Sequence, residues 1–145
     1  AVPRRDHVVV VGLGQVGLRL CTLLRACQIP VVAIERDEEA ETVGLAREMK
    51  LPVVVGRGAD PSLMRRLSLH RARAVAAVTS DDLVNISTAM TARGIHEPVR
   101  VVLVDRGGRQ LPICPQHCGA KVEVPPGQRL RLNRGDDGNM RSRRR

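Results

Sequence analysis

The sequence predicts an α/β fold of the doubly wound class: a parallel sheet of five or six strands with helices on both faces. Short runs of Val, Ile and Ala recur along residues 1–105, as in strands that are buried on both faces. Segments of helical period separate these runs, so that strand and helix alternate. A glycine-rich turn, Gly12 to Gly17, joins the first strand to the first helix.

The first strand is expected at residues 7–11, because its apolar run stops abruptly at Gly12. The next helix has one apolar face, formed by Val16, Leu20, Leu23, Leu24 and Cys27. Cys21 and Cys27 are both expected on its buried side, where cysteine behaves as a small apolar residue.

A second buried strand is expected at residues 31–34, ending at Glu35-Arg36-Asp37. Residues 38–50 then read as a helix whose apolar stripe is Val43, Ala46 and Met49. Its expected first turn contains three carboxylates, those of Glu38, Glu39 and Glu41. Negative charges stabilise the positive amino-terminal end of a helix.

The third and fourth strands are expected at residues 53–55 and 74–78. Between them Asp60-Pro61 marks a helix start, because Asp can cap and Pro suits the first helical position. After the fourth strand, Thr79-Ser80-Asp81-Asp82 caps a helix that ends at Gly94. Three residues mark the expected buried face of this helix: Leu83, Ile86 and Met90.

A fifth strand at residues 99–104 leads into Asp105, and residues 121–124 are a candidate sixth strand. We therefore expect one domain over residues 1–125. Residues 126–145 are rich in Pro, Gly and Arg and are expected to be disordered.

Composition restricts the function. The formal net charge is +9, but much of it lies in residues 126–145, and the chain has no Phe, Tyr or Trp. No aromatic side chain can therefore stack on nucleobases, and nucleic-acid binding is not expected. No apolar run is long enough for a membrane helix, so the chain is expected to be cytoplasmic. Cys114, His117 and Cys118 offer three close ligands where structural zinc wants four, and free thiols are expected there.

The glycine-rich turn has the context of a phosphate loop in a Rossmann-type fold, because it follows a strand and opens an amphipathic helix. Gly12 permits the tight turn, Gly14 lets a pyrophosphate approach the backbone, and Gly17 lets the helix pack closely on the sheet. Free amide N–H groups at the helix start would bind the phosphates. The alternative is a glycine-rich turn that binds nothing.

Glu35 lies 23 positions after Gly12, at the end of the next strand, where it can accept hydrogen bonds from ribose hydroxyls. A carboxylate there favours NAD(H) over NADP(H), although Arg36 beside it could accept an additional phosphate. Because every ribonucleotide carries the same diol, Glu35 does not separate NAD from ATP, ADP or AMP.

The segment from Val9 to Gly17 resembles the start of the RCK domain, also called the TrkA-N domain. Further stretches resemble the same family in order: Ile34 to Asp37, Leu51 to Gly56, Ala72 to Asp82 followed by Asn85, and Val99 to Val104. The resemblance covers residues 6–105. It implies a non-catalytic domain that binds NAD(H) or ATP, ADP or AMP and regulates a potassium channel or transporter.

The resemblance also assigns roles to matching residues. Gly12, Gly14 and Gly17 form the phosphate loop, and Gln15 and Val16 supply backbone N–H groups. Glu35 contacts the ribose and Arg36 flanks the adenosine, while Thr79 and Ser80 line the distal half of the ligand. Asp81 and Asn85 are further candidates, with capping and solvation of the helix start as the alternative role.

Two features depart from the family. After the third strand the family usually has Gly-Asp-Ala, whereas this sequence has Gly56-Arg57-Gly58-Ala59-Asp60. Either Arg57 replaces the acid, and meets a phosphate or lies in solvent, or a shifted loop supplies Asp60. The stretch before residue 121, with Pro112 and Pro115, also looks too broken for the helix that the family has there.

The leading hypothesis is therefore a cytoplasmic nucleotide sensor, at the inner face of the membrane through its partner and assembled as a homodimer or higher oligomer. One alternative is a fragment of an NAD-dependent oxidoreductase, which would need a substrate domain and a proton donor. None of the four histidines, at positions 7, 70, 96 and 117, is placed as a catalytic group. The other alternative is a degenerate domain that only mediates protein–protein contacts.

Overall fold

The computed structural model describes residues 1–105 and 109–111, all within the compact unit Ala1–Ile113. Four sequence-based expectations lie outside these residues: the broken stretch with Pro112 and Pro115, the sixth strand at 121–124, the disordered segment 126–145 and the arrangement of Cys114, His117 and Cys118. Within the described residues no helix is long and apolar enough to cross a bilayer.

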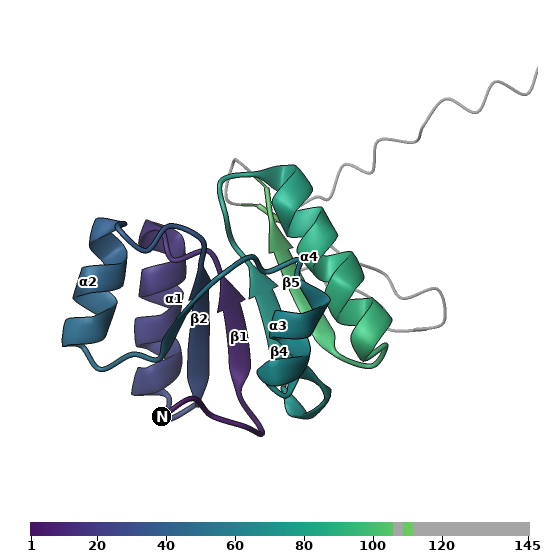
Figure 1. Ribbon diagram of the computed structural model, residues 1–145, viewed down its shortest axis with the longest axis horizontal. Helices are drawn as coiled ribbons and strands as arrows, with labels where there is room; N and C mark the ends of the chain where they lie inside the picture. The colour runs from purple at the N-terminus through teal and green to yellow at the C-terminus, as the bar shows by residue number, and fades with distance from the viewer. Residues whose placement is uncertain (106–108, 112–145) are drawn as a thin grey trace, which may run out of the picture. The chain divides into compact units, whose positions relative to one another are not determined.

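Five parallel strands form the sheet, in the order β3-β2-β1-β4-β5. The predicted doubly wound topology is thus confirmed (Figure 1). The strands are β1 (Val8–Val11), β2 (Val31–Glu35), β3 (Val53–Val55), β4 (Ala74–Ala77) and β5 (Arg100–Val104). A short strand that no sequence pattern predicts, β6 (Gln110–Leu111), pairs antiparallel with β5.

Helices cover both faces of the sheet (Figure 1). One face carries α1 (Gln15–Ala26) and α2 (Glu41–Glu48). The other carries α3 (Pro61–Arg66), the 3₁₀ helix η1 (Leu69–Arg71) and α4 (Asp82–Ile95).

The central strand β1 shows how one strand serves both layers. Val8 and Val10 pack in a core with residues of α1 and α2, whereas Val9 and Val11 pack with residues of α3 and α4. Val9 and Val10 are fully buried, and burial of each such side chain stabilises the fold by about 1.5–3 kcal/mol. The continuous valine run is therefore explained by burial on both sides.

The buried face of α1 matches the predicted one only in part: Leu20 and Leu24 pack against the core as expected. Gly17 and Cys21 are buried, whereas Val16 and Leu23 are each 57% exposed and Cys27 is also exposed. A Cβ atom on Gly17 would lie 1.9 Å from the carbonyl oxygen of Gly12. The helix therefore approaches the glycine loop closely at Gly17.

The helix predicted over residues 38–50 is shorter in the structure, because a turn occupies its expected start. The Asp37 carboxylate accepts a hydrogen bond from the Glu39 backbone N–H at 3.0 Å, and α2 begins only at Glu41. Val43 and Ala46 are buried as expected, but Met49 is 40% exposed and lies beyond the helix.

The predicted face of α4 is wrong. Leu83 and Met90 are 75% and 71% exposed, and Ile86 is 42% exposed. The buried residues of α4 are instead small or polar: Asn85, Thr88, Ala89 and Ala92. Small side chains let the helix axis lie close to β4 and β5. The large apolar side chains of Leu83, Ile86 and Met90 lie on the opposite side of the helix and take no part in that packing.

The predicted helix starts at Asp60 and Asp81 are confirmed. The Asp60 carboxylate accepts a hydrogen bond from the Ser62 N–H at 2.8 Å, with Pro61 in the first helical position. The Asp81 carboxylate accepts hydrogen bonds from the N–H groups of Leu83 and Val84 at 2.9 and 3.2 Å.

Candidate functional site

A pocket of about 1110 Å³ opens where the parallel strands end. Its walls come from the carboxyl ends of β1, β2, β4 and β5 and from the loops that follow β1 and β3. In doubly wound sheets this edge, at the point where strand order reverses, is where ligands bind. Here the reversal lies between β1 and β4.

The structure brings nearly all of the predicted site residues to this pocket. Nine of the ten line it: Gly12, Gly14, Gln15, Val16, Glu35, Arg36, Arg57, Thr79 and Ser80. The tenth, Gly17, is buried beneath the loop.

The fold requires glycine at two of the three glycine positions in the loop, for different reasons, and not at the third. Gly12 has φ +96°, and a Cβ there would lie 2.7 Å from the Thr79 methyl group, so both conformation and space require glycine. Gly17 is required by the close contact with the Gly12 carbonyl. Gly14 has an ordinary φ of −71° and no atom within 4 Å of a Cβ, so the fold itself does not require glycine there.

The first turn of α1 lies at the pocket. No side chain caps this helix, and its first turn holds no acidic residue. By contrast, Asp60 caps α3, Asp81 caps α4 and Glu41 lies in the first turn of α2. The N–H groups at the start of α1 therefore face a cavity lined by Gln15 and Val16, where an anion would complete their hydrogen bonding.

Glu35 is held in place by backbone donors at the end of β2. Its Oε1 accepts hydrogen bonds from the N–H groups of Arg36 and Asp37 at 2.8 and 3.0 Å. Its Oε2 accepts one from Leu13 N–H of the glycine loop at 2.7 Å. Because Oε1 already accepts two hydrogen bonds and Oε2 only one, Oε2 retains acceptor capacity and can also receive a hydroxyl donor from a ligand.

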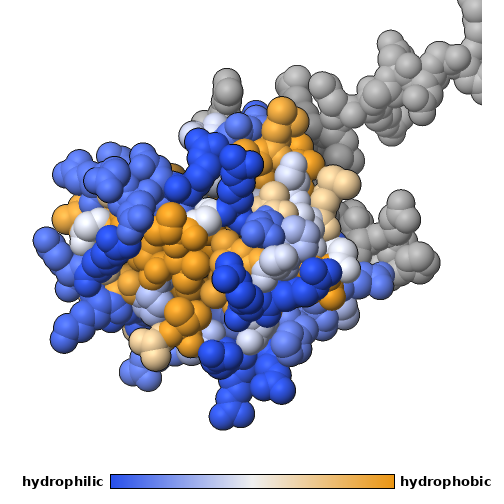
Figure 2. Space-filling model, in the orientation of Figure 1, coloured by the Kyte–Doolittle hydropathy of each residue, from blue (hydrophilic) through white to orange (hydrophobic). Residues whose placement is uncertain are grey.

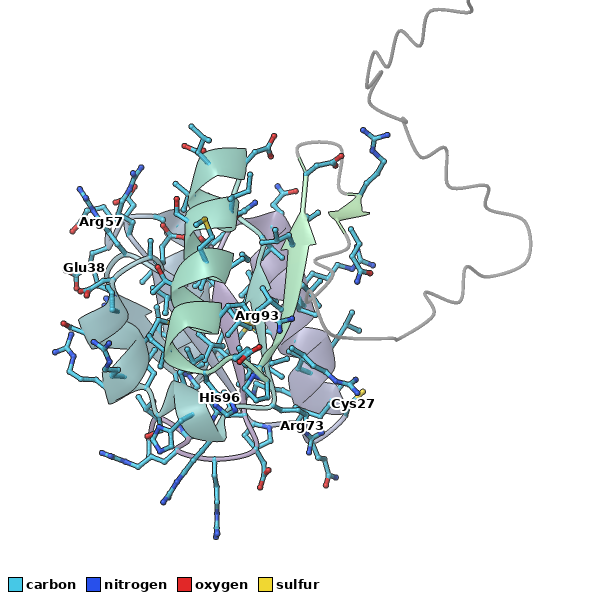
Figure 3. The ribbon with its side chains drawn as sticks, turned by 90° about the vertical axis from the view of Figure 1, so that its right-hand side faces the viewer. Cys27, Glu38, Arg57, Arg73, Arg93 and His96 are labelled. Carbon is cyan, nitrogen blue, oxygen red and sulfur yellow. The ribbon has the colours of Figure 1, made fainter. Side chains whose placement is uncertain are left out.

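The loop after β3 places its two candidate residues differently. Arg57 lines the pocket, whereas Asp60 caps α3 and does not line it. Arg57 and Glu38 both lie near the edge of the molecule where the strands end (Figure 3). The side chain of Glu38 pairs with Arg47 at 3.0 Å. Arg36 and Arg57 form no salt bridge with any residue that the structure describes.

The wall after β4 is organised by Asn85, which does not line the pocket itself. Its Oδ1 accepts hydrogen bonds from the Thr79 N–H and hydroxyl at 3.0 and 2.7 Å. Its Nδ2 donates to the carbonyl oxygens of Thr79 and Val104 at 3.0 and 2.9 Å. Asn85 thus ties the end of β4 to the end of β5, a role that differs from both ligand contact and solvation of the helix start.

Several pocket residues were not singled out from the sequence. Gly58 is buried, and a Cβ there would lie 2.2 Å from a Val11 methyl group. Asp105 follows the last residue of β5, and its place directly after a buried strand is the signal that could have found it. The sequence offered no comparable signal for the remaining lining residues on α4, which are Leu83, Val84 and Ser87.

The described histidines and cysteines lie away from the pocket. None of the described histidines lines it, and no cluster of metal-ligating side chains occurs among the residues that the structure describes. His7 is buried, with its Nε2 2.9 Å from the Leu67 carbonyl oxygen, and burial lowers its pKa. Burial also raises the pKa of the Cys21 thiol to about 11, so this cysteine stays protonated at neutral pH.

Comparison with known protein families gives one match over most of the chain. The sequence model described as the TrkA-N domain matches residues 8–113. Potassium channel protein 1 of Methanocaldococcus jannaschii is 21% identical over 135 residues, covering 83% of this chain and 40% of that protein. Trk system potassium uptake protein trkA homolog 1 of Methanosarcina mazei is 38% identical over 85 residues, covering 59% of this chain and 20% of that protein. The chain thus spans less than half the length of these relatives.

Solved structures share the fold. The TrkA-N domain of the inner membrane protein ybaL from Escherichia coli superposes with a TM-score of 0.62 at 25% identity, covering 70% of this chain and 73% of that one. The GsuK channel bound to NAD gives 0.62 at 21% identity, covering 70% and 18%. The Shewanella denitrificans Kef CTD in its AMP bound form gives 0.58 at 14% identity, covering 68% and 57%.

Proposed function

Because the chain belongs to the TrkA-N domain family, we propose that it is a non-catalytic domain that senses an adenine nucleotide and so regulates a membrane potassium channel or transporter. The observation that carries the proposal is the uncapped first turn of α1, which faces the pocket beside Gly14. An anion is the ligand that such a helix start favours, and a phosphate is the commonest one in this fold.

The ribose and phosphate functions have separate supports in the pocket. Glu35 offers a fixed acceptor, its Oε2, for a ribose hydroxyl, and the start of α1 offers donors for a pyrophosphate. NAD(H) is the first candidate, with ATP, ADP and AMP as alternatives. Structures of similar fold with bound NAD or AMP support this class of ligand.

Regulation requires that the nucleotide favour one arrangement of the assembled protein over another. We infer a cytoplasmic domain, assembled as a homodimer or higher oligomer, that acts on a potassium-conducting partner in the membrane. The relatives named as a potassium channel protein and a potassium uptake protein support this partner class.

Isothermal titration calorimetry of the full chain with NADH, NAD, ATP, ADP and AMP tests the proposal. At least one of them should bind, and Gly14→Asp should weaken that binding by at least about 100-fold, or about 2.7 kcal/mol, because a carboxylate would occupy the phosphate position. Gly44→Asp is the matched control, because Gly44 lies in α2, outside the pocket, with no atom within 4 Å of a Cβ. It should bind like the parent protein.

Two outcomes would count against a nucleotide sensor. If none of the five compounds binds at millimolar concentration, the pocket is not a nucleotide site and a protein-contact module becomes the better description. If Gly14→Asp binds as tightly as Gly44→Asp, the ligand lies elsewhere on the chain. Circular dichroism of both variants establishes that each is folded.

A further inference from the structure

The edge of the sheet where the strands begin carries a concentration of arginines. They occur in the segments before β1 and β4, at the start of β5 and at the end of α3. These seven, which we call the amino-edge arginines, are Arg4, Arg5, Arg65, Arg66, Arg71, Arg73 and Arg100, and all are exposed.

Backbone contacts place these segments side by side. Val8 is opposite Ala74 in the sheet, and Ala74 is opposite Arg100. The Arg73 N–H donates to the His7 carbonyl oxygen at 2.7 Å, and the Asp6 N–H donates to the Arg71 carbonyl oxygen at 2.9 Å. The end of α3 joins the same edge through the hydrogen bond between the His7 ring and the Leu67 carbonyl.

The positive charge of this edge is largely uncompensated. None of the amino-edge arginines forms a salt bridge with any residue that the structure describes, and Asp6 and Glu97 are the acidic residues nearby in the chain. Helix dipoles account for Arg65 and Arg66, in the last turn of α3, because cations stabilise a helix end. They do not account for Arg4, Arg5 and Arg73, which lie outside helices.

The opposite edge has the opposite character. Acidic residues gather around the pocket and the helix starts: Glu35, Asp37, Glu38, Glu39, Glu41, Asp60, Asp81, Asp82 and Asp105. Charge is therefore segregated along the strand direction. Figure 3 shows Arg73 at the edge where the strands begin, far from Arg57 at the pocket edge. In Figure 2 strongly hydrophilic side chains project from the corresponding lower edge.

We propose that the amino-edge arginines bind the surface of an anionic phospholipid bilayer. Each arginine close to such a surface contributes about 1 kcal/mol of attraction. The edge consists of loops and element ends, and presents no helix or β-ribbon along its length that could enter a nucleic-acid groove. The chain also lacks aromatic side chains that would stack on bases. Exposed apolar residues at the same edge, Val2 and Pro30, suit a lipid interface better than a nucleic acid.

The lipid-binding edge and the nucleotide pocket can be occupied together, because they lie at opposite ends of the strands. Bilayer binding would hold the domain beside a membrane partner and leave the pocket open to the solvent. The interaction rests on the amino-edge residues and does not require that the pocket bind a nucleotide, so the two proposals can fail separately.

Co-sedimentation of the full chain with vesicles tests the proposal. The protein should bind vesicles of phosphatidylcholine with phosphatidylglycerol, should not bind phosphatidylcholine alone, and should dissociate as salt concentration rises. Arg71→Glu with Arg73→Glu should weaken binding at least tenfold. Arg4→Glu with Arg5→Glu, which changes the segment before β1, should do the same and covers the case in which the first pair impairs folding.

Arg143→Glu with Arg144→Glu is the matched control, because it changes the net charge by the same amount but lies in the arginine-rich segment 126–145. It should retain more vesicle binding than either edge variant. If it abolishes binding while the edge variants bind normally, the proposal is wrong. It is equally wrong if the edge variants lose affinity for duplex DNA, measured by fluorescence anisotropy, while anionic vesicles do not bind the parent protein.

Discussion

The carboxylate of Glu35 accepts a hydrogen bond from the backbone N–H of Leu13 at 2.7 Å. This contact joins the end of β2 to the glycine loop after β1, two segments separated by the whole of α1. The acid expected to contact the ribose therefore also fixes the loop expected to contact the phosphates. The two halves of the proposed nucleotide site are parts of one hydrogen-bonded unit.

A change at Glu35 should alter recognition of the ribose 2′-hydroxyl. We expect the parent protein to bind ATP more tightly than 2′-deoxy-ATP, and Glu35→Gln to reduce that preference by about tenfold, since hydrogen bonds to charged groups contribute about 1.5–3 kcal/mol. Calorimetry with both nucleotides and both proteins gives the coupling energy between the carboxylate and the hydroxyl. If the preference is unchanged in Glu35→Gln, the carboxylate acts only on the loop.

Gly17→Ala should destabilise the fold strongly. The added methyl group would lie 1.9 Å from the Gly12 carbonyl oxygen, so α1 must move away from the sheet. We expect a loss of about 2–3 kcal/mol, at the upper end for overpacked cores. Urea unfolding measures this loss. Gly44→Ala, in the open middle of α2, should instead stabilise the protein by about 0.5–1 kcal/mol. Similar effects of the two substitutions would show that the helix does not contact the loop as described.

Removing the Asn85 side chain should separate the ends of β4 and β5. Asn85→Ala leaves the Thr79 N–H and the Val104 carbonyl without their side-chain partner. We expect a loss of about 2–4 kcal/mol, because two or more buried polar groups would be unsatisfied. Thr88 lies three positions after Asn85 in α4. Its buried hydroxyl has no hydrogen-bond partner among the described residues. Thr88→Val should therefore leave thermal stability unchanged or raised, and a loss comparable with that of Asn85→Ala would contradict the difference between the two sites.

The stability of the protein should fall as the pH is lowered through the titration range of His7. Burial lowers the pKa of this histidine from 6.5, so the unfolded chain takes up a proton at a pH where the folded protein does not. The contribution is fully present above pH 6.5 and is lost as the pH falls toward the folded-state pKa. Urea unfolding between about pH 8 and 5 should show this slope, and His7→Gln should flatten it. His70→Gln, at an exposed residue, should keep the slope, and a flattened slope there would assign the effect to the wrong histidine.

The strands and the topology could be predicted from the sequence because burial on both faces leaves a plain apolar run. The rotation of α4 could not be predicted, although the buried Val43 and Ala46 of α2 follow the expected stripe. In α4 the residues against the sheet are Asn85, Thr88, Ala89 and Ala92, whereas the most apolar side chains point outward. Apolar periodicity identifies a buried face only when the contact is made by large side chains. Here close approach is made by small ones, and neither hydrophobicity nor helical period reveals which small residues are used.

The candidate site was predictable to the extent that backbone geometry defines it. The glycine loop and the strand ends place Gly12, Glu35 and Thr79 at one pocket, and the order of the motifs was enough to expect this. The role of Asn85 depends on hydrogen bonds to two different strand ends, a relationship that exists only after β4 and β5 are paired. The position of Arg57 likewise depends on the path of the loop after β3. The sequence of that loop did not determine its path, because either Arg57 or Asp60 could have faced the pocket.

Because no atom lies near a Cβ at Gly14, the substitutions tolerated there should depend on whether variants are selected for folding or for ligand binding. In a library screened only for folded protein, positions 12 and 17 should accept glycine and little else, whereas position 14 should accept many residues. Screened for ligand binding, all three positions should retain glycine. Glycine at position 14 would thus be retained because of the ligand in the pocket, whereas glycine at positions 12 and 17 would be retained because the fold requires it.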